Sequence, residues 1–435
     1  MMHKEALFPP ELPQPRVAYS PAVKAGPFVF VSGQLASDLS TGTPARATLN
    51  PQFPHHGSDI ERQTRFIGEN IEICLRAGGA KLEHVVHFTN YLTDPRDQAG
   101  ATRALTACFG GTPPPTSTLL VEELPIPGCL SEIDLIALVP GPGERLEVLT
   151  PVGLASPLPA HLDGSPLYQY GVKCGPWLFT SGLLATDFND AIAPAARTTA
   201  TFPYYGEDAR LQTAHILEQL SAVLAAGGAT LADVVKAEVY LTDLKDFFRV
   251  DEVWREFFPH EPPARTTVPV KDLGVPGARI AINLIAFLPG PGQIRRTIHT
   301  DEAPRPLAHE PQAVQAGPLL FFSAQMATDY RTGVPAEARL NPAFPFYGSE
   351  SAAQVNYIVK HIDAICRAAG TASENLVRRR GFYTDFSEFF TSFATWGKAF
   401  PSAPPASTTI RVPTPLLVPG CKVAIDLIAV IPDAQ

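Results

Sequence analysis

The sequence of 435 residues contains no run of about 18 apolar residues, the length that a membrane-crossing helix needs. Residues 1–10 also lack the apolar stretch of a secretory signal peptide. The six cysteines form no C-x-x-C pair, and Cys74, Cys129, Cys366 and Cys421 lie in apolar segments, where a free cysteine behaves as a small hydrophobic residue. We therefore expect a cytoplasmic protein with no membrane contact, no disulfide and no zinc site.

Positive charge is scarce as well, because 34 Lys and Arg stand against 43 Asp and Glu and give a net charge of −9. A chain of this charge without basic clusters offers no surface for a nucleic-acid backbone. The exception is Arg378–Arg380, in an alternating strand-like stretch, where a solvated face is the expectation. No phosphate loop, dinucleotide-binding fingerprint or nucleophile elbow occurs. We expect no nucleic-acid partner and no cofactor.

The pattern that is present occurs three times. Each copy opens with Gly-Pro and a short apolar run, at Gly26, Gly175 and Gly317, with an aspartate 68 and a threonine 92 positions after each glycine. A period near 145 residues is that of a domain, and it is far too long for a solenoid repeat. The Pro-Gly-Pro-Gly segments at 140–143 and 289–292 punctuate the first two copies. The predicted domains are 1–145, 146–293 and 294–435.

Within a copy, strand signals alternate with two helical ones. In the second copy they predict a buried strand at 177–181, an amphipathic helix at 212–226, a half-buried strand at 234–241, a helix at 244–258 and an apolar strand at 278–288. The apolar run of 278–288 is typical of a strand that is covered on both faces. One helix layer covers only one face, so the neighbouring copies are expected to cover the other.

Five motifs in fixed order carry a resemblance. They are G-x-x-x-x-x-S-G from Gly175, an A-G-G helix end, V-V-K-A-x-V-Y-L-T-D, F-P-x-x-P-P-A-R-T-T and I-x-x-I-A. Together they resemble the RidA/YjgF family of reactive-intermediate deaminases over nearly all of each copy. The resemblance implies an α+β fold of three chorismate-mutase-like units, each a mixed sheet backed by two helices. Family members form trimers with clefts between subunits, so the chain is expected to be a single-chain pseudo-trimer, with further oligomerisation left open.

The resemblance also assigns the site. The arginine of the P-A-R-[ST] motif binds the substrate carboxylate in the family, and Arg265 and Thr266 match that motif. A guanidinium group presents two donors that fit a carboxylate. The counterparts of Arg265 are Thr116 and Ser407, which lack this fork. One cleft of the three is therefore expected to keep the carboxylate anchor.

An acidic residue on the last strand holds a water in the family. The matching residues are Asp134, Asn283 and Asp426, so the copy with Arg265 has an amide at this position. An amide orients water but takes no proton from it, which argues against ordinary deamination in that copy. Capping of a buried backbone group is an equally good interpretation of all three. Arg265, Asn283, Asp134 and Asp426 are the expected catalytic residues.

Further residues are expected to bind the substrate. A family tyrosine corresponds to Tyr19 and Tyr168, with Glu310 in the third copy, and the serine-glycine pair to Ser32-Gly33 and Ser181-Gly182, with Ser323-Ala324 in the third copy. Arg197 lies in a loop with aromatic neighbours that fits either a pocket or a structural loop. The pair His55-His56 lacks ligands at metal spacing, so no metal is expected.

Three functions follow as alternatives. The resemblance implies that a small enamine or imine that bears a carboxylate is hydrolysed to a 2-oxo acid and ammonia in a cleft around Arg265, without a cofactor. A second alternative is a non-catalytic small-molecule-binding or scaffold pseudo-trimer, suggested by the loss of Arg at Thr116 and Ser407 and of the acid at Asn283. A third is a pathway-specific hydrolase or deaminase with a larger substrate, because the fold does not fix the function.

Overall fold

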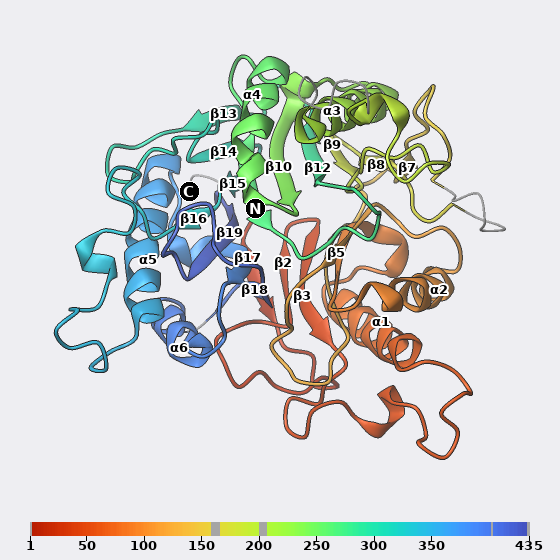
Figure 1. Ribbon diagram of the computed structural model, residues 1–435, viewed down its shortest axis with the longest axis horizontal. Coiled ribbons are helices and arrows are strands. Elements are labelled where there is room, and N and C mark those ends of the chain that lie inside the picture. The colour runs from red at the N-terminus through yellow and green to blue at the C-terminus, as the bar shows by residue number, and fades with distance from the viewer. Residues whose placement is uncertain (1, 158–165, 200–206, 402, 433–435) are drawn as a thin grey trace.

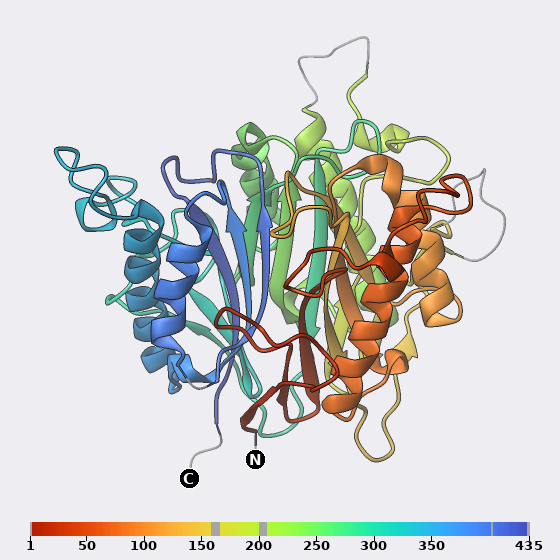
Figure 2. The ribbon, with the colours of Figure 1, turned by 90° about the horizontal axis from the view of Figure 1, so that it is seen from below.

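The three copies form three similar units around a common centre. The computed structural model describes residues 2–157, 166–199, 207–401 and 403–432. Each unit is a mixed sheet with two helices on its outer face, and the inner faces of the sheets meet in the middle of the molecule (Figures 1 and 2). The helix pairs α5–α6, α3–α4 and α1–α2 lie at the left, top and lower right of Figure 1.

The first unit shows the order of elements that all three share. Its strands are β1 (Lys4–Leu7), β2 (Ala22–Ala25), β3 (Phe28–Leu35), β4 (Val85–Leu92), β5 (Thr116–Leu120) and β6 (Ser131–Leu138), and its helices are α1 (Asp59–Ala77) and α2 (Gln98–Phe109). The sheet order is β1-β2-β3-β6-β4-β5, in which β4 and β5 are parallel and the other neighbours antiparallel. This is the mixed α+β arrangement that the resemblance predicted.

The other two units repeat it. The second contains β7 (Glu147–Val148), β8 (Gly171–Cys174), β9 (Trp177–Thr180), α3 (Asp208–Ala226), β10 (Val234–Leu241), α4 (Phe247–Phe257), β11 (Ala264–Pro269) and β12 (Ile280–Phe287). The third contains β13 (Arg295–Ile298), β14 (Ala313–Ala316), β15 (Leu319–Phe322), β16 (Gln325–Met326), α5 (Glu350–Ala369), β17 (Leu376–Tyr383), α6 (Phe389–Ala399), β18 (Ala406–Arg411) and β19 (Val423–Val430).

Local chemistry sets the ends of the helices. The amphipathic pattern predicts α3 from 212, and the helix extends one turn further back, to Asp208. It ends at Ala226 because Gly227 caps it and Gly228 takes a positive φ of 77°, which favours glycine. The second predicted helix begins at Phe247, three residues later than expected, because 244–246 form a 3₁₀ turn started by Asp243.

The inner faces of the three sheets form a shared core. The ring of Trp177 in the second unit lies 5.4 Å from that of Phe28 in the first and 6.0 Å from that of Phe321 in the third. All eight residues of β12 are buried, as the apolar run predicted. Burial of apolar side chains between units stabilises closure at about 25 cal/mol per Å² removed from water.

Two predictions about polar strand residues were wrong. Residues 234–241 were expected to form a half-buried strand, and Arg378–Arg380 a solvated face. In the structure every residue of β10 and β17 is buried, with Arg379 and Arg380 0% exposed. Lys236, Arg378 and Arg380 lie on the inner side of their strands, where they pair with carboxylates of another unit. Arg379 lies on the opposite side of β17, near Phe393 and Trp396 of α6.

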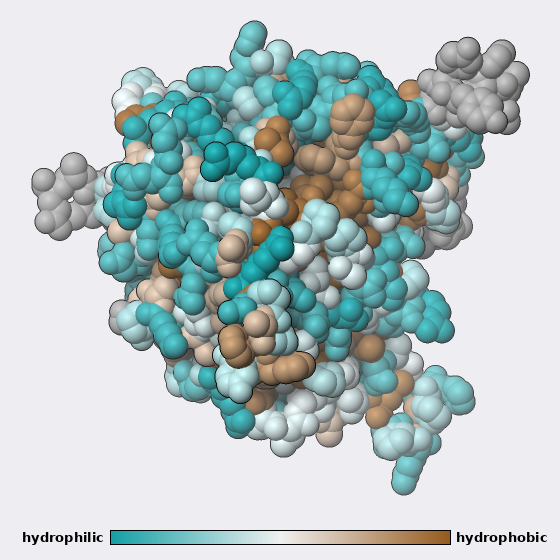
Figure 3. Space-filling model, turned by 60° about the vertical axis from the view of Figure 1, so that its left-hand side comes forward, coloured by the Kyte–Doolittle hydropathy of each residue, from teal (hydrophilic) through white to brown (hydrophobic). Residues whose placement is uncertain are grey.

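The face of the molecule seen in Figure 3 is mostly hydrophilic, with apolar patches between polar side chains. The largest exposed apolar side chains include Phe346 and Tyr347, which lie in the loop before α5. Among the helices of the described ranges, none combines the length and apolar character needed to cross a membrane.

Candidate functional site

Each cleft combines the end of one unit with the start of the next. The hydroxyl of Ser181 accepts a hydrogen bond from the Thr116 N–H at 2.9 Å. In the same way Ser323 accepts from the Arg265 N–H at 3.0 Å, and Ser32 accepts from the Ser407 N–H at 2.7 Å. Each unit therefore contacts the next, and the third contacts the first. We name the clefts first-to-second, second-to-third and third-to-first after the units that meet there.

Arg265 in the second-to-third cleft is already paired within the chain. Its side chain is fully buried, its Nη2 lies 2.5 Å from Oδ1 of Asp251, and its Nε lies 2.7 Å from Oε2 of Glu310. Burial opposes ionisation of Asp251, but Arg265 outweighs it and holds the pKa of this carboxyl below its usual value. Glu310 stands where the first two units have tyrosine. Burial raises the pKa of Glu310 above its usual value, although Arg265 opposes this shift. Two internal carboxyl groups thus occupy the place that the sequence assigned to a substrate carboxylate.

An Arg265→Lys variant should therefore keep substrate turnover within about twofold of the unsubstituted protein. Lysine retains a charge for Asp251 and loses the forked geometry, so the change should lower stability more than activity. Steady-state kinetics and a denaturant titration of the same preparation measure the two effects. If the folded variant instead loses turnover by a hundredfold or more, Arg265 takes part in substrate binding or catalysis.

The first-to-second cleft is small and uncharged. Its cavity of about 80 Å³ is lined by Phe88, Thr116, Tyr168 and Gly182, among other residues without charge. Tyr168, Ser181 and Gly182 therefore lie across from the first unit, and the structure does not bring them together with Arg265 of their own unit. The reason is the cyclic order of the clefts, in which the first strand and the arginine strand of one unit face different neighbours.

The third-to-first cleft is the open one. Its volume is about 550 Å³, which lies within the range of about 300–1,000 Å³ that is usual for ligand pockets. Tyr19 and Gly33 of the first unit line it, and the N–H of Gly33 donates a hydrogen bond to Thr408 Oγ1 at 3.1 Å. Their expected role in substrate binding stays a prediction. Ser407 and Thr409 line the opposite side. An apolar wall is formed by Val17, Leu35, Leu39, Ile126, Phe389, Phe390 and Phe393.

Glu132, on β6, is the carboxyl group of this cleft, and the sequence reasoning missed it. It lines the cleft at 2% exposure, and its Oε2 has no hydrogen-bond partner in the part of the chain that the structure describes. Burial, reinforced by the charge of Asp134, raises the pKa of Glu132 well above its usual value. A Cβ on Gly33 would come within 1.9 Å of Glu132 Oε1, so glycine at this position makes room for the acid.

A signal for Glu132 was present in the sequence. It precedes Asp134 by two residues, so both lie on the same face of the strand. Strand register aligns Glu132 with Tyr91, Ala281 with Tyr240 and Ala424 with Phe382. From the sequence, the copies were compared at Asp134, Asn283 and Asp426. Two residues earlier, the first copy has Glu132 where the other two have alanine.

Arg379 lies next to two residues that line the same cleft, Ser407 and Thr409. It pairs across β17 and β18 with Ser407, and its Nη1 donates to the hydroxyls of Ser407 at 3.0 Å and Thr409 at 3.3 Å. Its Nη2 donates to the Tyr383 hydroxyl at 2.9 Å. Within the described residues no carboxylate pairs with Arg379, and its Nε has no partner. A buried guanidinium without an internal anion thus lies behind the hydroxyls that line the cleft.

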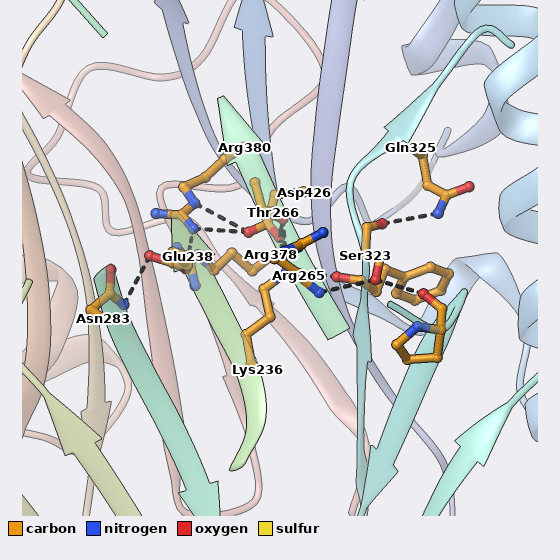
Figure 4. A network of polar contacts seen from close by, with 12 residues as sticks. Lys236, Glu238, Arg265, Thr266, Asn283, Ser323, Gln325, Arg378, Arg380 and Asp426 are labelled. Carbon is orange, nitrogen blue, oxygen red and sulfur yellow. Dashed lines mark hydrogen bonds and ion pairs between the residues drawn. The ribbon is translucent and has the colours of Figure 1, made fainter. Parts of the chain in front are cut away.

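The predicted acid positions lie elsewhere, in a buried network at the centre (Figure 4). Asp426 accepts from Lys236 at 2.5 Å and from the Thr266 hydroxyl at 2.7 Å. Asn283 donates to Glu238 at 3.1 Å and accepts from Ser117 at 3.2 Å. Asp134 accepts from the Tyr91 hydroxyl at 3.1 Å and lies 3.9 Å from Arg378. The structure thus places Asp134, Asn283, Asp426 and Thr266 in contacts between strands and units.

Arg380 connects this network across all three units. Its guanidinium bonds to Glu238 of the second unit and to Asp426 at 3.0 Å, and it donates to the hydroxyls of Tyr91 in the first unit at 3.4 Å and Tyr240 at 3.3 Å. Burial opposes ionisation of Asp426, but Lys236 and Arg380 outweigh it and lower the pKa of this carboxyl. Burial likewise opposes ionisation of Glu238, but Arg380 and Arg378 lower the pKa of this carboxyl to about 2. The network therefore favours the charged forms of Glu238 and Asp426 and fixes how the units face one another.

Comparison with known proteins places the chain in a family. The family model described as Endoribonuclease L-PSP matches residues 10–139, 161–288 and 300–431. The chain belongs to this family, also called RidA/YjgF. A RutC family protein of Saccharolobus solfataricus is 40% identical over 106 residues, which are 24% of this chain and 75% of that protein. A RutC family protein of Pyrococcus abyssi is 35% identical over 136 residues, or 31% of this chain and 98% of that protein.

Among solved structures, RidA from an Antarctic Psychrobacter is 28% identical and has a TM-score of 0.25. It covers 32% of this chain, while 98% of that protein is matched. The family model matches three successive segments, and 31% of this chain matches 98% of the Pyrococcus protein, so the chain is a RidA/YjgF protein with three copies in one polypeptide.

Relative to the RidA/YjgF motif, the third unit has moved its arginine to the neighbouring strand. In the second unit Ala237 pairs with Arg265, whereas in the third Arg379 pairs with Ser407. Both guanidinium groups reach the same kind of place, because Arg265 lies 4.9 Å from the ring of Trp254 and Arg379 lies 5.0 Å from that of Trp396. The third unit thus has a buried guanidinium at the place where the second unit has Arg265, although its motif position is Ser407.

The remaining site prediction, Arg197, lies outside the clefts. Its side chain is half exposed and pairs with Asp190 at 3.4 Å. This contact agrees with the structural-loop interpretation. Over the described ranges, no group of three or more His, Cys, Asp or Glu residues is placed to hold a metal ion.

Proposed function

We propose that this chain hydrolyses a carboxylate-bearing imine, which can arise from an enamine, to a 2-oxo acid and ammonia in the third-to-first cleft. RidA/YjgF proteins are often linked to such deamination. The observation that carries the proposal is Glu132, a buried carboxyl with a raised pKa that lines the one large cleft described between units. The raised pKa favours the protonated form of this carboxyl to higher pH than in an ordinary glutamate.

A protonated Glu132 supplies the acid that the reaction needs. It donates its proton to the enamine carbon or the imine nitrogen, and the resulting carboxylate then accepts a proton from the water that attacks the imine carbon. Glu132 then returns this proton to the nitrogen of the tetrahedral intermediate, the carbon–nitrogen bond breaks as ammonia leaves, and the hydroxyl proton passes to Glu132 as the carbonyl of the 2-oxo acid forms. One imine and one water give one oxo acid and one ammonia, so no oxidant or cofactor enters the balance.

The other two clefts support the choice of the third. The second-to-third cleft holds Arg265 between two carboxylates and has Ala424 at the position of Glu132. The first-to-second cleft has Ala281 there and about 80 Å³ of space. Catalysis in one of three clefts follows from these differences, because fusion lets each cleft change separately.

The test is to generate imino acids in place with an amino-acid oxidase and catalase, and to follow imine decay and ammonia release with and without the protein. We expect the protein to speed the decay of the imine and to release ammonia in large excess over its own concentration. Saturable binding of 2-oxo acids without faster ammonia release would favour the alternative of a binding pseudo-trimer and contradict the proposal.

A further inference from the structure

We infer that the third-to-first cleft selects a carboxylate with a ring-sized apolar body. Ser407 and Thr409, backed by Arg379, hold the carboxylate, and the phenylalanines of α6 hold the body. The inference rests on the cleft chosen for the proposed function and adds its substrate class.

The hydroxyls of Ser407 and Thr409 are turned into donors by Arg379. Both hydroxyl oxygens accept a hydrogen bond from its Nη1, and neither hydroxyl donates to an acceptor among the described residues. A hydroxyl that accepts from a cation is a better donor, because the bonds polarise one another. Since both residues line the cleft, they offer two donors to an anion there.

An anion bound in the cleft would stabilise the buried positive charge of Arg379. Arginine stays protonated in proteins, and a buried charge without a partner is costly. At the corresponding place in the second-to-third cleft, Arg265 pairs with Asp251 and Glu310, although its Nη1 has no partner among the described residues. The residues of the third-to-first cleft at those two positions are Phe393 and Tyr19, so neither supplies a carboxylate. A bound carboxylate would complete the pairing.

The apolar body of the ligand packs against the apolar wall. Helix α6 carries Phe389, Phe390 and Phe393, whose rings form a connected group with centroids 5.3 Å apart between Phe389 and each of the other two. The corresponding residues of α2 are Gln98, Ala99 and Thr102. Phe390 is 72% exposed although it lines the cleft, so a ligand can cover it.

The size of the cleft agrees with a ring. A three-carbon acid such as pyruvate would fill a small part of about 550 Å³ and would touch few of the aromatic residues. Aromatic groups pack well against phenylalanine rings in edge-to-face or offset geometry. A carboxylate held at Ser407 and Thr409 with an aryl or cyclic side chain would occupy both the polar end and the wall.

Isothermal titration calorimetry with phenylpyruvate and pyruvate tests the inference. We expect phenylpyruvate to bind at least about tenfold more tightly, because burial of a ring contributes that much or more. Phe390→Ala should remove most of this preference and leave the affinity for pyruvate unchanged. Its matched control is Phe248→Ala, the same position of α4 beside Arg265, which should change neither affinity. Equal affinity for the two acids, or an equal effect of both alanine variants, would overturn the inference.

The anion end needs its own variants. Ser407→Ala with Thr409→Val removes both hydroxyls and keeps Arg379, and Arg379→Gln removes the charge. Each change should lower the affinity for both phenylpyruvate and pyruvate at least about tenfold, as expected for loss of hydrogen bonds to a charged group. If both proteins are folded and bind as before, the assignment of the anion end is wrong. If phenylpyruvate binds tightly and in preference to pyruvate but no ammonia is released, only the proposed hydrolysis is refuted. If ammonia is released but phenylpyruvate is not preferred, only this inference is refuted.

Discussion

Glu132→Gln is expected to lower kcat for imine hydrolysis by about 10²–10⁴-fold, the usual contribution of a general acid or base. The amide keeps the shape of the side chain but can neither donate an acidic proton nor take one from water. Stopped-flow measurement of imine decay gives the rate, and calorimetry with phenylpyruvate shows whether the cleft still binds. We expect the affinity for phenylpyruvate to stay within a few-fold.

The pH profile separates chemistry from structure. Because burial raises the pKa of Glu132, its acid form persists to higher pH than in an ordinary glutamate, and activity that needs its proton is lost as the pH rises through the raised pKa. The residual activity of the Gln variant should lack this alkaline decline. Glu310→Gln changes a carboxyl of another cleft and should keep both the rate and the profile. A Glu132→Gln protein with unchanged kcat would exclude Glu132 as the catalytic acid.

Arg380→Met is expected to destabilise the folded chain by about 3–5 kcal/mol, the usual cost of removing one partner from a buried ion pair. The change leaves Glu238 and Asp426 without the guanidinium that bonds to both, in a region closed to water. Urea unfolding followed by fluorescence measures the shift in midpoint. Arg46→Met, which removes an ion pair at the surface, is the control and should shift the midpoint little.

The same network predicts the response to acid. Burial disfavours the charged form of Asp426, but Lys236 and Arg380 reverse the balance and lower its pKa. A carboxyl with a lowered pKa in the folded state contributes stability above its unfolded pKa of about 4, and this stability is lost as the pH falls below that value. The unsubstituted protein should therefore lose stability below about pH 4, and Arg380→Met should lose less over that interval. An equal pH dependence in both proteins would show that the network does not hold these carboxylates charged.

The fold could be predicted from the sequence because each of its causes is local or repeated. Apolar periodicity, the glycines after the first helix of each unit and the apolar last strand specify one unit, and the threefold repeat specifies how its inner face is covered. The burial of Arg378–Arg380 could not be predicted in this way. A strand pattern shows that a face is polar, but it does not show whether water or another charged sheet lies opposite.

The site was predicted less well for a related reason. The partners of Arg265 are Asp251, which lies on another element of its unit, and Glu310, which belongs to the next unit, so no short motif reveals the pairing. Arg379 replaces the motif arginine from a neighbouring strand, and only the register of β17 with β18 shows it. Tyr19 and Gly33 could be proposed from the sequence because the motif lies in their own segment, and both line the third-to-first cleft.

The most direct test of the central claim is a crystal structure of the protein with phenylpyruvate. The account predicts one molecule per chain, in the third-to-first cleft, with its carboxylate on the hydroxyls of Ser407 and Thr409 and its ring against Phe389 and Phe390. Asp251 and Glu310 should remain on Arg265 in the same crystal. A carboxylate bound to Arg265, or equal occupancy of all three clefts, would contradict it.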